Sequence, residues 1–129
     1  MFNRVQKQMQ VALSAMLLML GWQLQAADIN QQALLANQMS ATPYVIVDVR
    51  SPEEFAEGHL KGAINIPHDQ TDAYQTQLEA LKGKPLVVYC RSGRRASMFE
   101  QLLTPKGYEI LHLEGDVQAW QAAELPLIK

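Results

Sequence analysis

The chain has a single cysteine, Cys90, among its 129 residues. One thiol excludes an intramolecular disulfide, a CxxC redox motif and a cysteine-based zinc finger. The net charge of only −2 removes the chain-wide basic excess that is typical of nucleic-acid-binding proteins, so no nucleic-acid partner is expected. Hydrophobic residues make up 48% and charged residues 19%, a globular composition that excludes a disordered or collagen-like chain. The length then allows one domain at most.

The sequence also lacks an apolar run of the ~20 residues that a membrane-spanning helix needs. Residues 11–20 are apolar apart from one serine, only positive charges precede them, and Ala26 and Ala27 offer small residues for cleavage. This is the pattern of a secretory signal peptide. We therefore expect residues 1–26 to be removed and residues 27–129 to form the mature, periplasmic domain without a stable membrane anchor. A buried helix and an uncleaved anchor are the alternatives.

Removal of the predicted signal peptide leaves nine basic and 13 acidic side chains, a net charge of −4. The lone thiol is then unusual, because proteins of oxidising compartments normally pair their cysteines or lack them.

Segments typical of strands and of helices alternate along residues 27–129. The predicted strands are 44–49, 63–66, 86–89 and 110–113. The predicted helices run from Asn30 toward Met39, from the capping box at Ser51, over 71–81, from about Arg95 to near Gly107, and over 116–122. This alternation predicts an α/β fold: one domain with a central parallel sheet and helices on both faces.

Two polar segments directly follow predicted strands. Asp48 and Arg50 lie at the end of the first strand, and Cys90 follows the third. In open α/β sheets the binding crevice lies beyond the carboxyl ends of the strands, so both segments are expected at one site.

The second segment has the composition of an anion site. A cysteine at a helix N-terminus is favoured as a thiolate, and Gly93 gives the loop the freedom to turn its N–H groups inward. Cationic residues are unfavourable at a helix N-terminus unless an anion sits among them. The segment contains Arg91, Ser92, Gly93, Arg94 and Arg95. These residues predict a nucleophilic cysteine with a loop that binds a small anionic substrate. In the alternative, Cys90 is a small core residue, Arg91 and Arg94 are solvated, and Arg95 pairs with a carboxylate.

Three ordered motifs carry a family resemblance. They are VIVDVRSPEEF (45–55), GHLKGAINIP (58–67) and YCRSGRR (89–95). Together they resemble the rhodanese (thiosulfate sulfurtransferase) domain over roughly residues 29–120. The resemblance implies that Cys90 takes a sulfane sulfur from thiosulfate or a similar anionic donor and holds it as a persulfide. The sulfur then passes to a thiophilic acceptor, either cyanide or a thiol, possibly a protein thiol. No metal or organic cofactor is implied.

The length of the cysteine loop favours this class over related phosphatases. In those enzymes five residues separate the cysteine from an arginine, and here Ala96 stands at that arginine's position. Asp48 and Arg50 are expected to brace the loop rather than react. Asp116 departs from the resemblance, because Gly115-Asp116 stands where two glycines are common.

Two other functions remain open: a non-catalytic rhodanese-like binding module, and a thiol-redox protein of the cell envelope that needs a partner thiol. The three histidines show no metal-ligand spacing, so no metal site is expected. His59 and Trp120 are expected to be structural.

Overall fold

Residues 27–129 are described in a computed structural model of the chain. The predicted signal peptide, residues 1–26, lies outside the described residues. Among the described residues, no helix is long and apolar enough to cross a membrane.

A five-stranded sheet forms the centre of the fold. Its strands are β1 (Ala27–Ile29), β2 (Val45–Asp48), β3 (Ile64–Asn65), β4 (Leu86–Tyr89) and β5 (Ile110–Leu113). The strand order is β1-β5-β4-β2-β3, and every neighbouring pair is parallel. The predicted parallel α/β sheet is therefore confirmed. The short edge strand β1 was not predicted, because it has only three residues and buries only Ile29.

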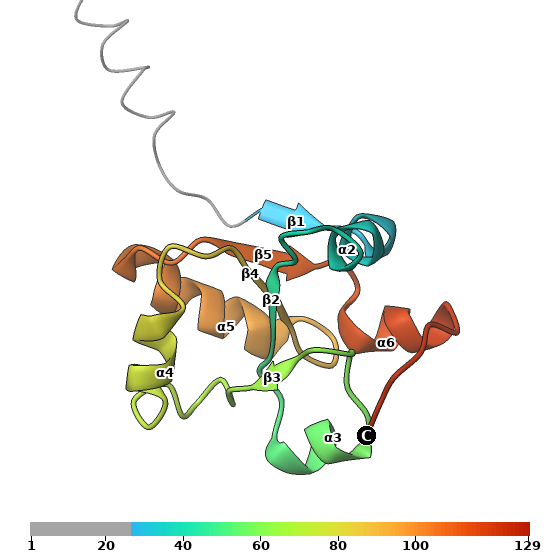
Figure 1. The fold of residues 1–129 in the computed structure, drawn as a ribbon. Helices are drawn as coiled ribbons and strands as arrows, with labels where there is room; N and C mark the ends of the chain where they lie inside the picture. Colours follow the sequence, from blue (N-terminus) through green and yellow to red (C-terminus); the bar gives the residue numbers. More distant parts are fainter. Residues whose placement is uncertain (1–26) are drawn as a thin grey trace, which may run out of the picture.

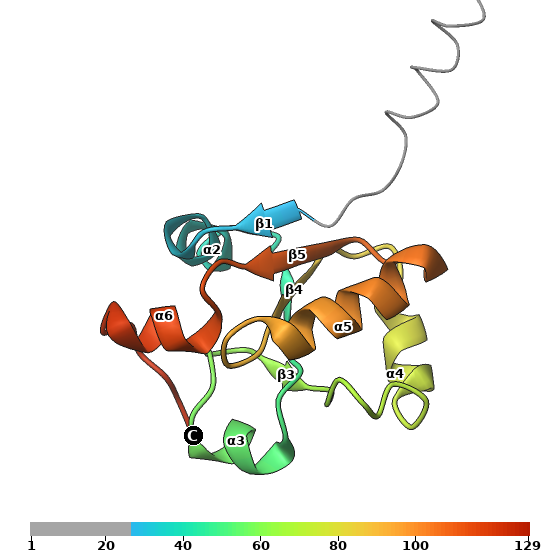
Figure 2. The same ribbon diagram turned by 180° about the vertical axis from the view of Figure 1, so that it is seen from behind.

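Helices cover both faces of this sheet, as predicted. They are α2 (Gln31–Gln38), α3 (Pro52–Glu57), α4 (Gln75–Ala80), α5 (Arg94–Leu103) and α6 (Asp116–Ala122), with the 3₁₀ turn η1 (Thr104–Lys106) after α5. Helices α4 and α5 lie on one face, α2 and α6 lie on the other, and α3 lies beyond the end of β2 (Figures 1 and 2).

Two helices differ in length from the prediction. Helix α4 begins at Gln75 rather than near Thr71, because residues 71–74 form turns. Helix α5 ends at Leu103 and continues only as η1, where Pro105 has no N–H to donate to an α-helical ladder.

The central strand β4 divides the core into two parts. All four of its residues are buried. Val88 packs with Phe99 of α5, while Val87 and Tyr89 pack on the other face with Trp120 of α6. A strand buried on both faces reads as a continuous apolar run, which is why this strand was predictable from the sequence.

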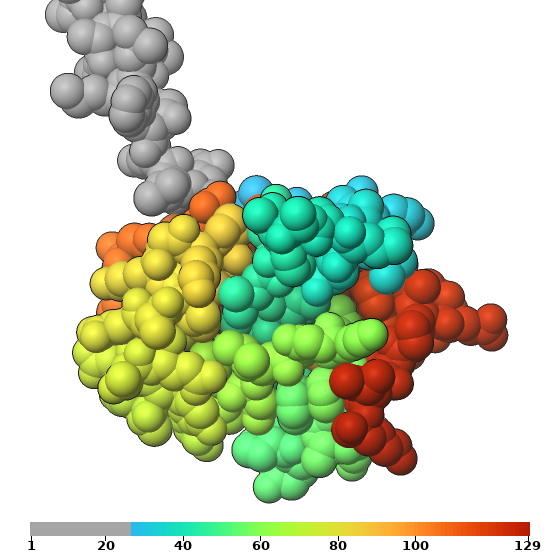
Figure 3. Space-filling view, viewed as in Figure 1, coloured from blue at the N-terminus to red at the C-terminus, as the bar shows by residue number. Residues whose placement is uncertain are grey.

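The C-terminal end of the chain closes against the segment that follows α3. His59 and Ile128 form an antiparallel bridge, and the red C-terminal residues lie beside the green segment in Figure 3. The His59 ring stacks on Phe55 with ring centroids 3.6 Å apart, and its Nδ1 lies 2.8 Å from the Phe55 carbonyl oxygen. His59 thus has the expected structural role, and so does Trp120, which is buried in the core.

Candidate functional site

The two predicted site segments follow adjacent interior strands, β2 and β4, at the carboxyl ends of these strands. Asp48 ends β2 and Tyr89 ends β4, and the two residues are direct register partners. The Tyr89 hydroxyl donates a 2.8 Å hydrogen bond to Asp48 Oδ2. Burial, with the neighbouring Asp48 charge, raises the pKa of Tyr89 far above its ordinary value, so the hydroxyl stays protonated and remains a donor. The two segments therefore begin side by side at the carboxyl ends of β2 and β4.

Cys90 lies between β4 and α5, at the N-terminus of a ten-residue helix. Its side chain is almost fully buried, and Sγ accepts a 3.0 Å hydrogen bond from the Gly93 N–H. Gly93 has a φ of +117°, a left-handed conformation that favours glycine. The loop therefore turns a backbone donor back onto the sulfur, as the sequence predicted, and the dipole of α5 acts in the same direction.

The arginines of the loop fall into two groups. Arg91 and Arg94 are exposed, whereas Arg95 is half-buried. Both terminal nitrogens of Arg95 bind Glu54, at 2.6 Å to Oε1 and 3.0 Å to Oε2. The hydrogen bond from Arg95 lowers the pKa of Glu54 to about 2, so the pair is ionised at neutral pH. The alternative in which Arg91 and Arg94 are solvated and Arg95 pairs with a carboxylate therefore describes all three arginines.

Glu54 was recognised from the sequence only as part of a capping box. The capping box is present: Ser51 accepts from the Glu54 N–H, and the Glu54 carboxylate accepts from Ser51. The same carboxylate ties helix α3 to the cysteine loop through Arg95. No sequence signal indicated this second role, because the two partners are 41 residues apart.

Asp48 and Arg50 form a buried ion pair. Arg50 Nη2 donates to Asp48 Oδ2 at 2.7 Å, and Nε donates to both carboxylate oxygens. Nη2 also donates to the Gly58 carbonyl oxygen at 2.7 Å. Within residues 27–129, neither side chain hydrogen-bonds to residues 90–95. The pair therefore supports the end of β4 through Tyr89 and the segment after α3, rather than touching the loop itself.

The first turn of α6 holds the start of the cysteine loop by hydrogen bonds. The Cys90 N–H donates to Asp116 Oδ1 at 2.9 Å, the Val117 N–H donates to the Cys90 carbonyl, and the Gln118 N–H donates to the Arg91 carbonyl. Asp116 is buried, so its carboxylate points into the protein rather than toward an approaching acceptor.

His112 joins Asp116 to Glu100, a contact that was not predicted from the sequence. Its Nε2 lies 3.0 Å from each Asp116 carboxylate oxygen, and its Nδ1 lies 2.8 Å from Glu100 Oε1. Hydrogen bonding to Asp116 and then to Glu100 raises the pKa of His112 to about 10, despite partial burial. His112 is therefore an imidazolium at neutral pH. Its only sequence signal was the unexpected aspartate that it binds.

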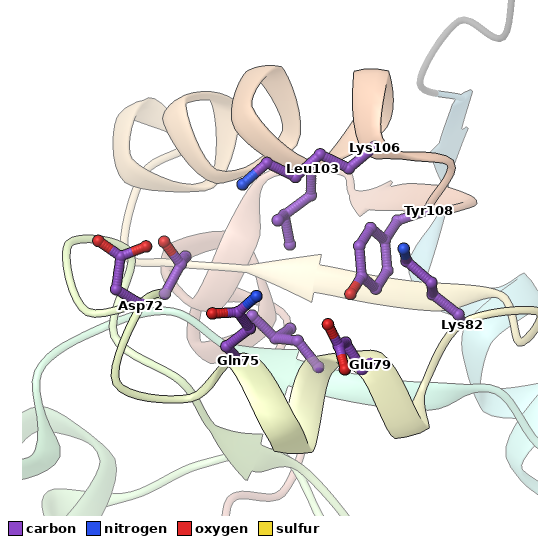
Figure 4. A pocket seen from close by; sticks show the side chains of 9 residues that line it. Asp72, Gln75, Glu79, Lys82, Leu103, Lys106 and Tyr108 are labelled. Carbon is purple, nitrogen blue, oxygen red and sulfur yellow. The ribbon is translucent and has the colours of Figure 1, made fainter.

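The part of the chain that the structure describes holds no group of three or more His, Cys, Asp or Glu side chains that could bind a metal ion. A hollow of about 240 Å³ lies between α4 and η1, where Lys82 lies beside Tyr108 (Figure 4). It is lined by Leu103, the last residue of α5, so it lies at the opposite end of this helix from Cys90.

The fold and the loop define an α/β protein with a buried cysteine at a helix N-terminus. Residues 31–123 match the model of the rhodanese-like domain. The chain belongs to this family.

The relatives agree with this assignment. The chain is 28% identical to a sulfurtransferase of Allochromatium vinosum over 78% of its own length and 94% of the relative's. It is 40% identical to an uncharacterized protein of Synechocystis over 66% of its length, and the match spans only 47% of that relative. Among solved structures, a rhodanese-related protein from Thermoplasma volcanium superposes with a TM-score of 0.69 at 29% identity, covering 79% of this chain and 97% of the other.

Proposed function

We propose that this protein is a sulfurtransferase that carries a sulfane sulfur on Cys90. The single observation that supports this function most is the hydrogen bond from the Gly93 N–H to Cys90 Sγ at the N-terminus of α5. A backbone donor and a helix dipole aimed at one sulfur atom stabilise negative charge on it, first as a thiolate and then as a persulfide. The rhodanese-like family and a relative named as a sulfurtransferase support the same class of reaction.

The proposed reaction has two displacement steps. The Cys90 thiolate attacks the outer sulfur of thiosulfate, a sulfur–sulfur bond forms, and the donor's own sulfur–sulfur bond breaks as sulfite leaves with the electron pair. An acceptor, cyanide or a thiolate, then attacks the outer sulfur of the persulfide. The thiolate of Cys90 leaves and is ready for the next donor. Neither step transfers a proton, so no general base is needed. The sulfane sulfur moves from one nucleophile to the next without net oxidation, so no outside oxidant is needed.

The arginines have different proposed roles. Arg91 and Arg94 are exposed in the loop that follows Cys90 and are proposed to attract the anionic donor. Both terminal nitrogens of Arg95 donate to the Glu54 carboxylate, so Arg95 is proposed to hold the loop against α3. The sequence predicted that Arg95, with the rest of the loop, binds the anionic substrate; its proposed role is this positioning one instead.

Sulfur transfer from thiosulfate to cyanide tests the proposal. Cys90→Ser removes the sulfur acceptor and keeps the size of the side chain, so activity is expected to fall to background. Intact-mass measurement after thiosulfate treatment is expected to show one added sulfur atom on the wild-type protein and none on the variant. Sulfite, which has no sulfane sulfur, is the control reagent. Activity retained by the Cys90→Ser variant would refute the mechanism.

The same measurements separate the two other functions. A wild-type protein that neither turns over nor gains sulfur is a binding module. A protein that gains no sulfur but forms mixed disulfides with a partner thiol is a redox protein.

We also propose that the domain acts in the periplasm, on the evidence of the sequence of residues 1–26 alone. Intact-mass analysis of the protein recovered from a periplasmic fraction is expected to show that these residues are missing. Recovery of the full-length chain only from the cytoplasm would overturn this proposal.

A further inference from the structure

A buried cluster of charged side chains lies beneath the cysteine loop and has no role in the reaction as proposed above. It consists of Glu100 of α5, His112 of β5 and Asp116 of α6, whose side chains are 11%, 15% and 3% exposed. Three elements therefore each contribute one charged group to the same place. Charged groups are rarely buried unless they are paired, so the cluster calls for an explanation.

This cluster is in contact with the loop at two points. Asp116 Oδ1 accepts the hydrogen bond from the Cys90 N–H. A Cβ atom on Gly93 would lie 3.1 Å from Asp116 Oδ2 and 3.7 Å from the His112 ring. Because the Gly93 N–H is the donor to Cys90 Sγ, only the backbone of the loop separates the cluster from the sulfur.

The position of Asp116 has a conformational cost. Its φ is +54°, in the left-handed region that non-glycine residues rarely adopt. The preceding Gly115 also has a positive φ, and a Cβ there would collide with Ala119. A glycine at 116 would relieve the strain, so the aspartate is held in place by the hydrogen bonds that it makes. Local strain of this kind is typical of functional sites.

The charges of the cluster raise a second problem. Two carboxylates beneath the loop would oppose the formation of an anion on Cys90 Sγ. The His112 cation lies between them, within 3.0 Å of both. Glu100 Oε1 is buried and lies 2.8 Å from His112 Nδ1, so the charge on His112 stabilises this carboxylate.

We propose that Glu100, His112 and Asp116 are positioning residues that hold the Cys90 loop, with the imidazolium of His112 offsetting one of the two negative charges beneath it. Asp116 fixes the Cys90 N–H, and His112 keeps that carboxylate from disfavouring the anionic sulfur. This inference deepens the proposed sulfur-transfer function and rests on it for its biological meaning.

The charged groups nearest His112 are Glu100 of α5 and Asp116 of α6. Its register partners are the exposed Asp28 on β1 and the apolar Val88 on β4, and the Cys90 loop lies on its remaining side. The hydrogen bonds to Asp116 and Glu100 keep His112 protonated through the neutral range, since they raise its pKa to about 10.

The pH dependence of alkylation at Cys90 tests the proposal. Cys90 is the only cysteine, so the pH dependence of the reaction of the full chain with iodoacetamide reports the ionisation of this thiol. His112→Gln removes the cation and leaves both carboxylates, so the midpoint of the rate–pH profile is expected to rise by about one pH unit, from one charge acting over several ångströms. At a pH below both midpoints, alkylation then slows by roughly tenfold.

Adding a second substitution reverses the sign of the effect. Asp116→Asn in the His112→Gln background removes one negative charge but keeps an acceptor for the Cys90 N–H, so the midpoint is expected to return toward that of the wild-type protein. His112→Lys is the matched control, because it keeps a cation and is expected to stay near the wild-type midpoint. A merely structural role predicts instead that the double variant is displaced at least as far as His112→Gln.

An unchanged or lowered midpoint in His112→Gln, or no recovery in the double variant, would overturn the proposal. If His112→Gln does not fold, Asp116→Asn alone decides: the midpoint is expected to fall, and an unchanged or raised midpoint refutes the inference. Alkylation needs no sulfur donor. The proposed role of the positioning residues and the proposed sulfur-transfer function can therefore be refuted independently of each other.

Discussion

Replacing Arg50 with methionine tests how the site edge is held together. Asp48 is fully buried, and Arg50 supplies three side-chain hydrogen bonds to it. Arg50→Met fills much of the same volume but leaves this carboxylate with the Tyr89 hydroxyl and one backbone N–H. Loss of one partner of a buried ion pair costs about 3–5 kcal/mol of unfolding free energy, because the remaining charge is uncompensated.

Urea unfolding at pH 7 measures this cost. Arg94→Met is the matched control, since the same change at an exposed arginine is expected to alter the free energy of unfolding by less than about 0.5 kcal/mol. Asp48→Asn combined with Arg50→Met removes both charges and is expected to cost less than the sum of the two single changes, with a coupling of about 1–3 kcal/mol. Additive costs, or a loss below about 1 kcal/mol for Arg50→Met, would refute a supporting role for the pair.

Three further predictions concern the cysteine loop. The folded-state pKa of His112, about 10, lies above its ordinary value of 6.5, so the stability it contributes is complete below pH 6.5 and lost as the pH rises toward 10. After allowance for solvent screening the loss is about 1–2 kcal/mol in urea unfolding, and His112→Gln is expected to lack this pH dependence. Gly93→Ala is expected to lower the rate of sulfur transfer at least tenfold, because the φ of Gly93 is +117° and a Cβ would press on the buried Asp116 carboxylate. Gly107→Ala is the control: Gly107 has a φ of +93° but open space around it, so this variant is expected to lose stability and keep its activity. Turnover is expected to fall as ionic strength rises, and the combined Arg91→Ala and Arg94→Ala variant is expected to lose most of that dependence.

The sequence was informative wherever one continuous segment determines the structure. The apolar run of β4 followed by Cys90 and Gly93 was enough to place a buried strand, a loop and a helix start, because strand burial and helix geometry act over a few neighbouring residues. The capping box at Ser51 was recognisable for the same reason. Strand β1 was not, because a three-residue edge strand has no periodic pattern and is specified by its pairing with β5.

The contacts of the loop could not be predicted in the same way. Arg95 meets Glu54 and Cys90 meets Asp116 across 41 and 26 residues of sequence, and only the packing of α3 and α6 around the sheet edge brings them together. The one useful signal was Asp116, an aspartate where the resemblance leads one to expect a glycine. A residue that breaks a local pattern at a strained position is expected to have a specific partner, and here that partner is the Cys90 N–H.

The distribution of the four arginines within residues 27–129 supports the proposal that a protein of net negative charge attracts an anionic donor. Arg50 and Arg95 are each paired with a carboxylate, so neither has a full charge left to offer a donor. Arg91 and Arg94 are exposed and, within residues 27–129, have no ion-pair partner. Exposed charges act over a distance of about 8–10 Å before salt screens them, so they guide encounter more than they hold a bound ligand. Attraction of the donor and stabilisation of the sulfur are thus assigned to different groups: two exposed arginines for the first, and the backbone of the loop with the dipole of α5 for the second.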